Sequence, residues 1–515
     1  MSDRALGRML VGNIIATAAG RYPHRQAFLC GVTGRRLTFG QTNERSNRLA
    51  HGLMGLGLVK GDVAAFLCTN RIEIPEIYFA LAKSGIVGIP LNYRLADSEI
   101  VELMRAMGAR ALLYEERFAD RALNIKAELP GVADLVQIGG HAPDSDLDYE
   151  ALLARSSSHE PEVEIDEADP YYFNLTSGTT GLPKSYLLTH FNNASIVPFG
   201  LAFDMTGRDV VMTVFPMFGR VGVAWMITSV VFGIANVLVN FEPATVLRFI
   251  QSERVTIMNL VPTMAAMLLA CDELPNTDLT SLRAIVFAGS MLPAPVREQT
   301  AAKLTRGIYE YYGMQETGVL AYSTPEDRQL RPDSVGRPTL FAEVRIVGPD
   351  GRGVPVGETG EIIGRSPSTV TAYFQSPARS ADTFRNGWVH TGDLGSLDAE
   401  GFLFIRGRVK DMIITGGQNV HSAEVEAALL SFPGVADCAV IGLPDELWGE
   451  SVTAIVVPSP NAAVDFESLR QFCRERLAGF KTPKHFHLHL AALPRTPTGK
   501  LQKYLLVEQY RGCDS

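Results

Sequence analysis

Two glycines and four hydroxyl residues fall within residues 176–181, and a lysine, Lys184, follows three residues later. Such a loop can wrap a polyphosphate, because glycine allows positive φ and a close approach of the backbone. Backbone N–H groups and hydroxyls then point at phosphate oxygens, with Lys184 as a point charge. The residues assigned to this phosphate loop are Thr176, Ser177, Gly178, Thr179, Thr180, Gly181 and Lys184.

The loop differs from a Walker A loop, which needs a glycine directly before the lysine and a helix behind it. Here Pro183 precedes Lys184, and residues 185–189 have the pattern of a strand, as do residues 171–175 in front of the loop. The sequence therefore predicts a phosphate loop between two strands. An ordinary polar hairpin is the alternative, since turns rich in Ser, Thr and Gly are common.

Four more motifs follow in order: Tyr312-Gly-Met-Gln-Glu316, Thr391-Gly-Asp393, Gly407-Arg408 and Pro494-Arg-Thr-Pro-Thr-Gly-Lys500. Together with the phosphate loop, the chain from about Thr38 nearly to its C-terminus resembles the adenylate-forming superfamily, in particular its acyl- and aryl-CoA synthetases. The resemblance implies an ATP-dependent carboxylic acid–CoA ligase. It forms an acyl-adenylate and pyrophosphate, and then passes the acyl group to the thiol of coenzyme A.

The predicted fold class is α/β. Helix-like and strand-like segments alternate at 43–58, 63–67, 74–84 and 86–90, which indicates a parallel sheet covered by helices. Short alternating strands at residues 334–366 indicate a small β-barrel-like subdomain. We expect a large N-terminal adenylating domain of doubly wound sheets at residues 1–408. The resemblance implies that residues 409–515 form a small mobile α+β domain that carries the adenylation lysine.

Adenylation needs no Ser/His/Asp triad, because the acid is already a nucleophile. The enzyme must hold two anions in line and neutralise developing charge. The resemblance assigns Lys500 to this charge and Glu316 to Mg²⁺, with Thr176 assisting. Magnesium favours one or two carboxylates together with phosphate oxygens. The family usually has threonine where this chain has Gln315, which leaves the local hydrogen bonding open.

The resemblance places the remaining ATP contacts at Tyr312, Gly313, Asp393 and Arg408. Asp393 would accept the ribose hydroxyls, and Arg408 would add a second contact. Without the motif, a turn aspartate and a surface arginine would be the ordinary interpretations. Lys410, two positions after Arg408, corresponds to the hinge between the domains, with a surface lysine in one continuous domain as the alternative.

The resemblance also predicts two binding channels. Gly416 and Gly417 would line the tunnel for the narrow thiol arm of coenzyme A, although glycine pairs also mark plain turns. The acyl pocket would be lined by Phe218, Gly219, Ala288, Gly289 and Met314. Where the family usually has histidine this chain has Gly219, which leaves room for a bulkier acid. Arg220 next to it would be either a contact for a polar substrate group or a surface residue.

Composition narrows the partners. The 515 residues have a net charge of −9 and no basic tract, which argues against nucleic-acid binding. Six scattered cysteines without a CxxC fit reduced thiols in a cytoplasmic protein. Residues 221–241 carry no charge but contain several polar residues, so we expect a buried helix ending near Gly233 and a buried strand at 234–239, with no membrane span.

Other activities remain open from the sequence. An enzyme that loads an acyl group onto the phosphopantetheine of a carrier protein would need the same adenylation residues. Oxidative adenylate chemistry of the luciferase kind and a binding protein with a decayed site are further alternatives; Glu316, Asp393 and Lys500 argue against decay. The acid is predicted only as hydrophobic, either fatty or aromatic/alicyclic. A homodimer is a candidate assembly.

Overall fold

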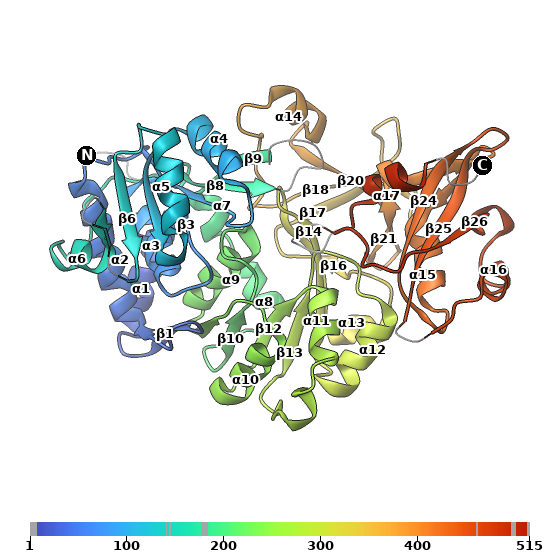
Figure 1. The fold of residues 1–515 in the computed structure, drawn as a ribbon, viewed down its shortest axis with the longest axis horizontal. Coiled ribbons are helices and arrows are strands. Elements are labelled where there is room, and N and C mark those ends of the chain that lie inside the picture. Colours follow the sequence, from blue (N-terminus) through green and yellow to red (C-terminus); the bar gives the residue numbers. More distant parts are fainter. Residues whose placement is uncertain are drawn as a thin grey trace.

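The structure, a computed structural model, describes residues 8–140, 142–143, 146–176, 184–459, 462–495 and 501–511. The side chain of Thr176 is outside this description, as are residues 177–183 and 496–500. Four sheets are formed, and the first two build most of the molecule (Figure 1). Because residues 177–183 and 496–500 are not described, most of the predicted phosphate loop and Lys500 lie outside the described residues.

The first sheet has seven strands and is parallel except for its last strand pair, β8 and β9. Its order is β7 (Leu147–Asp148), β6 (Asp134–Ile138), β5 (Ala109–Glu115), β3 (Val63–Leu67), β4 (Val87–Pro90), β8 (Pro170–Thr176) and β9 (Lys184–Thr189). The phosphate loop thus connects two paired strands, as the sequence predicts, and Thr176 is opposite Lys184 in the register.

The second sheet has nine strands with a parallel centre running from β14 to β1. Its order is β16 (Arg337–Pro338), β15 (Gly318–Ser323), β14 (Ile308–Met314), β13 (Ala284–Phe287), β12 (Ile257–Leu260), β10 (Val210–Thr213), β11 (Ala235–Leu238), β1 (Gln26–Cys30) and β2 (Arg36–Thr38). The buried strands are short apolar runs, as is typical of a sheet covered on both faces.

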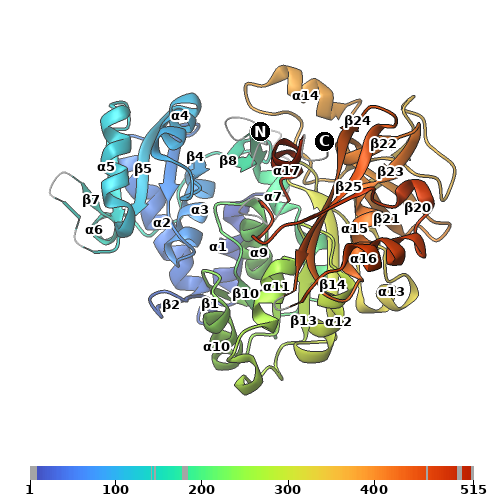
Figure 2. The same cartoon turned by 45° about the vertical axis from the view of Figure 1, so that its right-hand side comes forward.

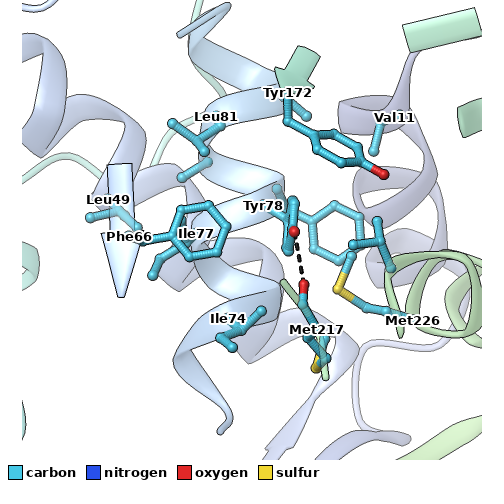
Figure 3. Packing of buried hydrophobic residues seen from close by; sticks show 14 of the residues in the cluster. Val11, Leu49, Phe66, Ile74, Ile77, Tyr78, Leu81, Tyr172, Met217 and Met226 are labelled. Carbon is cyan, nitrogen blue, oxygen red and sulfur yellow. Dashed lines mark hydrogen bonds between the residues drawn. The ribbon is translucent and has the colours of Figure 1, made fainter. Parts of the chain in front are cut away.

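The largest core fills the space between these two sheets. It contains residues of both sheets and of the helices α1 (Val11–Arg21), α2 (Phe39–Gly55), α3 (Glu73–Ser84) and α9 (Arg220–Val231). All twelve residues of α3 are buried, which is typical of a helix enclosed on every side. Figure 3 shows Tyr78 of α3 within this core, with its hydroxyl donating to the carbonyl oxygen of Met217 at 2.8 Å.

Further helices cover the outer faces and connect the sheets. In the N-terminal part they are α4 (Asp97–Met107), α5 (Ala119–Glu128), α6 (Tyr149–Ala154), α7 (His190–Ala194), α8 (Val197–Ala202), α10 (Pro243–Glu253), α11 (Pro262–Leu269), α12 (Ala294–Lys303), α13 (Pro325–Leu330) and α14 (Pro377–Thr383). The core under α4 and α5 is separate from the core under α10 and α11. Each sheet is therefore covered on both faces.

An antiparallel sheet of five strands follows where the sequence predicts a barrel-like piece. It contains β17 (Glu343–Val347), β18 (Gly360–Arg365), β19 (Phe384–Arg385), β20 (Trp388–Leu397) and β21 (Leu403–Arg408). The 3₁₀ turn η3 (Val409–Asp411) then leads into the last part of the chain.

The C-terminal part has its own core around a fourth, five-stranded sheet, seen to the right in both Figures 1 and 2. Its elements are β22 (Met412–Thr415), β23 (Gln418–His421), α15 (Ser422–Leu430), β24 (Val435–Asp445), β25 (Gly449–Pro458), α16 (Phe466–Arg474), β26 (His485–Leu488) and α17 (Lys503–Tyr510). The α+β composition agrees with the prediction from the sequence.

The uncharged segment at residues 221–241 forms α9 followed by β11, as predicted. Trp225 and Met226 in the middle of the helix are fully buried. In the described part of the chain, no helix is long and apolar enough to cross a membrane.

Candidate active site

The carboxyl ends of the strands of the two large sheets meet. Asn70, which follows β3 of the first sheet, donates from its amide to the carbonyls of Phe215 and Val239, which follow β10 and β11 of the second sheet. In open α/β sheets, ligands bind in the crevice at the carboxyl ends of the strands. The candidate site therefore lies at this junction.

Phe218 and Gly219, which are predicted for the acyl pocket, lie in residues 215–219, the candidate acid-binding loop. The first sheet holds this loop at the junction. Asn70 accepts a hydrogen bond from the N–H of Met217 at 2.8 Å, and Tyr78 donates to the carbonyl of the same residue. Phe218 packs edge-on against Tyr93 with ring centroids 5.4 Å apart. Gly219 is the N-cap of α9, so the loop is fixed at both ends.

The other predicted acyl-pocket residues lie at the same edge of the nine-stranded sheet. Ala288 and Gly289 follow β13, and Met314 ends the neighbouring β14. Gly289 has φ of +85°, and a Cβ at this position would lie 3.3 Å from Val261, which follows β12. The structure thus places Ala288, Gly289 and Met314 on adjacent parallel strands.

Glu316 follows this edge of β14 and is 6% exposed. Its Oε1 accepts a hydrogen bond of 2.7 Å from the hydroxyl of Tyr373. Burial, and then the Glu316 carboxylate, raise the pKa of Tyr373, so the hydroxyl stays a donor. The Glu316 carboxylate is therefore buried and is not a solvated group at a strand end.

Lys184 lies close to the same group. Its ammonium is 4.9 Å from the centre of the Tyr373 ring, the ring whose hydroxyl binds Glu316. Because Lys184 is the first residue of β9, the end of the phosphate loop is next to Glu316. Ser177, Gly178, Thr179, Thr180 and Gly181 are outside the described residues.

The two predicted ribose contacts, Asp393 and Arg408, form one hydrogen-bonded group with Tyr312. Asp393 is 6% exposed; its Oδ2 accepts from the Tyr312 hydroxyl at 2.8 Å, and its Oδ1 is 2.9 Å from Nε of Arg408. Burial, and then the Asp393 charge, raise the pKa of Tyr312 above its usual value and keep it protonated. The pairing of β20 with β21 places Asp393 directly opposite Arg408.

The structure explains why residue 313 is a glycine. A Cβ at this position would lie 2.1 Å from the carbonyl oxygen of Gly318 on the paired strand β15. A side chain at residue 313 would therefore break the hairpin that ends β14, and with it the approach to Glu316.

Glu361 orients the turn before Asp393, and the sequence did not indicate it. Its Oε2 contacts Nδ1 of His390 at 2.8 Å, and its Oε1 accepts from the N–H of Gly392 at 3.1 Å. Thr391 in turn donates to the carbonyl of Ile362 and accepts from the N–H of Asp393. The strand pairing of β18 and β20 could have suggested this contact, but only once the register was known.

Gln315, the departure from the family pattern, joins the two large sheets. Its side-chain oxygen accepts from Nδ2 of Asn174 at 2.7 Å, and its carbonyl accepts from the hydroxyl of Tyr186 at 2.7 Å. Asn174 and Tyr186 belong to β8 and β9, the two strands that carry the phosphate loop. The side chain of Gln315, which is longer than the threonine usual in the family, thus reaches across to the hairpin of β8 and β9.

Arg220 is not the surface residue that was one of the two alternatives from the sequence, while a contact to a polar substrate group stays a prediction. It is 8% exposed, so it is not a surface arginine, and its guanidinium donates to the main-chain carbonyls of Gln315 and Ser368. Those contacts occupy two edges of the guanidinium within the protein itself. They could not be foreseen because Ser368 is 148 residues away in sequence.

Lys410 lies in η3, between the last strand of the third sheet and the first strand of the fourth, and is exposed. Gly416 and Gly417 form the two-residue turn between β22 and β23, with φ of +57° and +76°. A Cβ on Gly416 would lie 2.6 Å from the indole of Trp448, whereas one on Gly417 would meet no atom within 4 Å. The glycine pair is thus a hairpin turn, and the Gly416 side of it faces Trp448.

The segment that carries Lys500 is outside the described residues, but both of its flanks are fixed to the C-terminal part. Nη2 of Arg495 contacts both oxygens of Asp437, at 2.9 and 2.8 Å. On the other side, Lys503 binds Glu426 at 2.6 Å and the hydroxyl of Ser422 at 2.8 Å. Arg495 and Lys503, on either side of that segment, therefore both bind side chains of the C-terminal part.

The residues present fit a magnesium ion bound together with phosphates. One oxygen of the buried Glu316 carboxylate is held by Tyr373, and no donor in the described residues contacts the other. Among the described residues, no group of three or more His, Cys, Asp or Glu side chains forms a metal cage. Magnesium often uses one or two carboxylates and completes its shell with phosphate oxygens and water, so a lone carboxylate beside a phosphate loop is suitable.

Comparison with known proteins agrees with this geometry. The family model described as AMP-binding enzyme matches residues 15–374, and the model described as AMP-binding enzyme C-terminal domain matches residues 424–500. The chain therefore belongs to the family of AMP-binding enzymes.

Relatives of known activity cover nearly the whole chain. The long-chain-fatty-acid–CoA ligase FadD13 of Mycobacterium tuberculosis is 34% identical over 97% of this chain and 98% of its own. The feruloyl-CoA synthase of an Amycolatopsis species is also 34% identical, over 93% and 95%. The crystal structure of ATP-bound MatB from Rhodopseudomonas palustris has a TM-score of 0.88 at 28% identity, over 98% of this chain and 100% of that one. The protein is an AMP-forming acid–thiol ligase.

Proposed function

We propose that this ligase activates a hydrophobic fatty or aromatic acid with ATP and Mg²⁺ and transfers the acyl group to coenzyme A. One observation carries the proposal: three features lie together at the carboxyl edge of the nine-stranded sheet. They are the candidate acid-binding loop, the buried Glu316 carboxylate, and Asp393 with its partners Tyr312 and Arg408. The activities of the relatives, long-chain-fatty-acid–CoA ligase and feruloyl-CoA synthase, support an acid with an apolar body.

In the first step the carboxylate of the acid attacks the α-phosphorus of ATP, and the bond to the β-phosphate breaks to release pyrophosphate. Thr176 and the loop up to Lys184 hold the phosphates, and Asp393, Tyr312 and Arg408 hold the ribose. Bound Mg²⁺ neutralises phosphate charge, and Glu316, with Thr176 assisting, would hold it. Lys500 neutralises the charge that develops between the carboxylate and the α-phosphate.

In the second step the thiol of coenzyme A attacks the acyl carbon of the adenylate. The carbon–oxygen bond to AMP breaks, and the thiol proton leaves to solvent. Gly416 and Gly417 would line the path of the thiol arm after residues 409–515 rotate about Lys410. A rotation explains how one site performs both steps.

The test is pyrophosphate exchange into ATP, measured for a panel of aliphatic and aromatic acids, followed by thioester formation with coenzyme A. We expect acid-dependent exchange and a thioester product. Thioester formation on a phosphopantetheine carrier protein in preference to coenzyme A would favour the alternative acceptor. If no acid in the panel supports exchange, the proposed function is wrong.

A further inference from the structure

Arg220 is a buried cation without a carboxylate partner in the described part of the chain. It is the first residue of α9, directly after Gly219, and its two contacts are main-chain carbonyls, those of Gln315 and Ser368. Burying a charge is costly unless its hydrogen bonds are well satisfied. The two carbonyl acceptors offset this cost, and the guanidinium thereby holds two main-chain positions that an apolar residue of similar size could not hold.

The first contact acts directly on Glu316. The carbonyl of Gln315 belongs to the peptide unit whose nitrogen is that of Glu316, so a donor on this oxygen fixes the orientation of the chain entering Glu316. The hydroxyl of Tyr186 shares the same oxygen at 2.7 Å. On the far side, the carbonyl of Glu316 accepts from the N–H of Val370 at 2.9 Å.

The second contact acts on the segment that supplies Tyr373. Ser368 also donates from its hydroxyl to the carbonyl of Asn192 at 3.0 Å, and Ser366 donates to the carbonyl of Thr317 at 2.6 Å. This segment leads to Tyr373, whose hydroxyl binds Oε1 of Glu316. Arg220 thus holds both the main chain before Glu316 and the segment that positions its carboxylate.

We propose that Arg220 is a positioning residue for Glu316 and that it couples the acid-binding loop to the metal-binding carboxylate. The inference rests on the proposed function. The planar guanidinium can bind two carbonyls at a fixed angle, whereas the ammonium of lysine is a single point charge. An acid bound beside Phe218 and Gly219 therefore lies one residue from the side chain that orients Glu316.

The experiment compares Arg220→Lys and Arg220→Gln with the unchanged protein. Binding of α,β-methylene-ATP is measured by calorimetry with Mg²⁺ and again with EDTA, and the magnesium dependence of pyrophosphate exchange is measured in parallel. We expect the Mg²⁺ concentration for half-maximal effect to rise about tenfold or more in both variants, since hydrogen bonds to charged groups have this effect when lost. Binding in EDTA should not change. Glu316→Gln should show the same pattern more strongly.

Arg283→Lys is the matched control. Arg283 also donates to a main-chain carbonyl, that of Asp204 at 2.7 Å, and it binds Asp209 before β10, at the opposite edge of the same sheet. This control should lower the thermal midpoint and leave the magnesium dependence unchanged. If Arg220→Gln does not fold, Arg220→Lys still decides the question.

An unchanged magnesium dependence in a folded Arg220 variant would overturn the inference. An equal shift in Arg283→Lys would also overturn it, because the effect would then be one of general stability. If the unchanged protein shows no acid-dependent exchange, the proposed function fails, and the calorimetric comparison with and without Mg²⁺ still tests Arg220.

Discussion

At the scale of single residues, the Asp393 group leaves room for the role proposed for it. A carboxylate has about four lone-pair sites. Tyr312 and Arg408 each occupy one of these sites, one on either oxygen of Asp393. The remaining sites can accept the two ribose hydroxyls, while the tyrosine and the arginine keep the carboxylate in one orientation.

Gly219 permits a direct test of the acid pocket. Its φ is −104°, and a Cβ at this position would contact only the carbonyl oxygen of Pro216, at 3.5 Å, so the backbone accepts a side chain. We predict that Gly219→His narrows the pocket and shifts preference toward smaller acids. One methylene of space changes discrimination by about 10–200-fold, so an imidazole should have a clear effect.

The measurement is kcat/KM for a series of aliphatic and aromatic acids with both forms of the enzyme. Gly20→His, on an exposed position of α1 where a Cβ meets nothing within 4 Å, is the control and should leave the series unchanged. If Gly219→His leaves the order of preference unchanged, Gly219 does not line the pocket.

Motifs single out Glu316, Asp393 and Lys184 as candidates, since each proposed role requires one type of side chain at a short spacing; these roles stay predictions. The residues that orient the three side chains in the structure could not be predicted. Glu361 acts on the turn before Asp393 from a different strand, and Arg220 reaches a segment 148 residues away. Such contacts depend on tertiary structure, and no local pattern encodes them.

At the scale of elements, most helices and strands could be predicted, because apolar periodicity and turn residues mark them. Residues 63–67 form a strand with the predicted bounds, and the predicted helix at 74–84 begins only one residue earlier, at Glu73. Within residues 409–515, the hairpin of β24 and β25 extends beyond its apolar residues, reaching Asp445 and starting again at Gly449. Polar residues near its tip hid the strand pattern, while the backbone pairing continues through them.

The contact between α1 and α7 makes the free energy of unfolding depend on pH. Nδ1 of His190, at the start of α7, accepts from the N–H of Val11 at 3.4 Å, and the ring stacks on Tyr171. Burial lowers the pKa of His190 to about 4, and the repulsion from Lys60 adds to it against the attraction of Asp169. The folded protein therefore resists protonation at a pH where the unfolded chain already binds a proton.

The contribution of the neutral, buried His190 to stability is fully present above pH about 6.5 and is lost as the pH falls toward about 4. We predict that the free energy of unfolding falls by about 2 kcal/mol from His190 alone between pH 7.5 and pH 5. Urea unfolding of the unchanged protein and of His190→Phe, which keeps an aromatic ring, measures this. The variant should show the smaller change with pH; an equal change in both would contradict the prediction.

The turn η3 is the element at which rotation is proposed. Lys410 is exposed and sits between β21 and β22, which belong to different sheets. Proline fixes φ near −65°. We predict that Lys410→Pro holds one orientation, so that adenylation survives while thioester formation is lost, as measured by exchange and by coenzyme A consumption. Lys410→Ala should retain both steps. Loss of adenylation alone, or of neither step, would argue against a hinge.

At the scale of the whole molecule, the two half-reactions are assigned to different positions of the C-terminal part. The described residues that flank Lys500 are bound to that part, Arg495 through Asp437 and Lys503 through Glu426. The glycine turn at Gly416 belongs to the same sheet core. In the proposed mechanism, a rotation that brings the glycine turn to the site also moves these two flanking residues.

This linkage makes the effect of Lys500 specific to one step. We predict that Lys500→Ala lowers the rate of adenylate formation by 100-fold or more, on the order of 3–4 kcal/mol, because its charge acts in that transition state. Thioester formation from a supplied acyl-adenylate should be nearly unchanged. Lys503→Ala, which removes the anchor at Glu426 and Ser422 but not the charge on Lys500, is the comparison and should have a smaller effect on adenylation. An equal loss in both half-reactions of Lys500→Ala would show that Lys500 supports the fold or ATP binding in general. The assignment of each half-reaction to its own orientation of the C-terminal part would then be wrong.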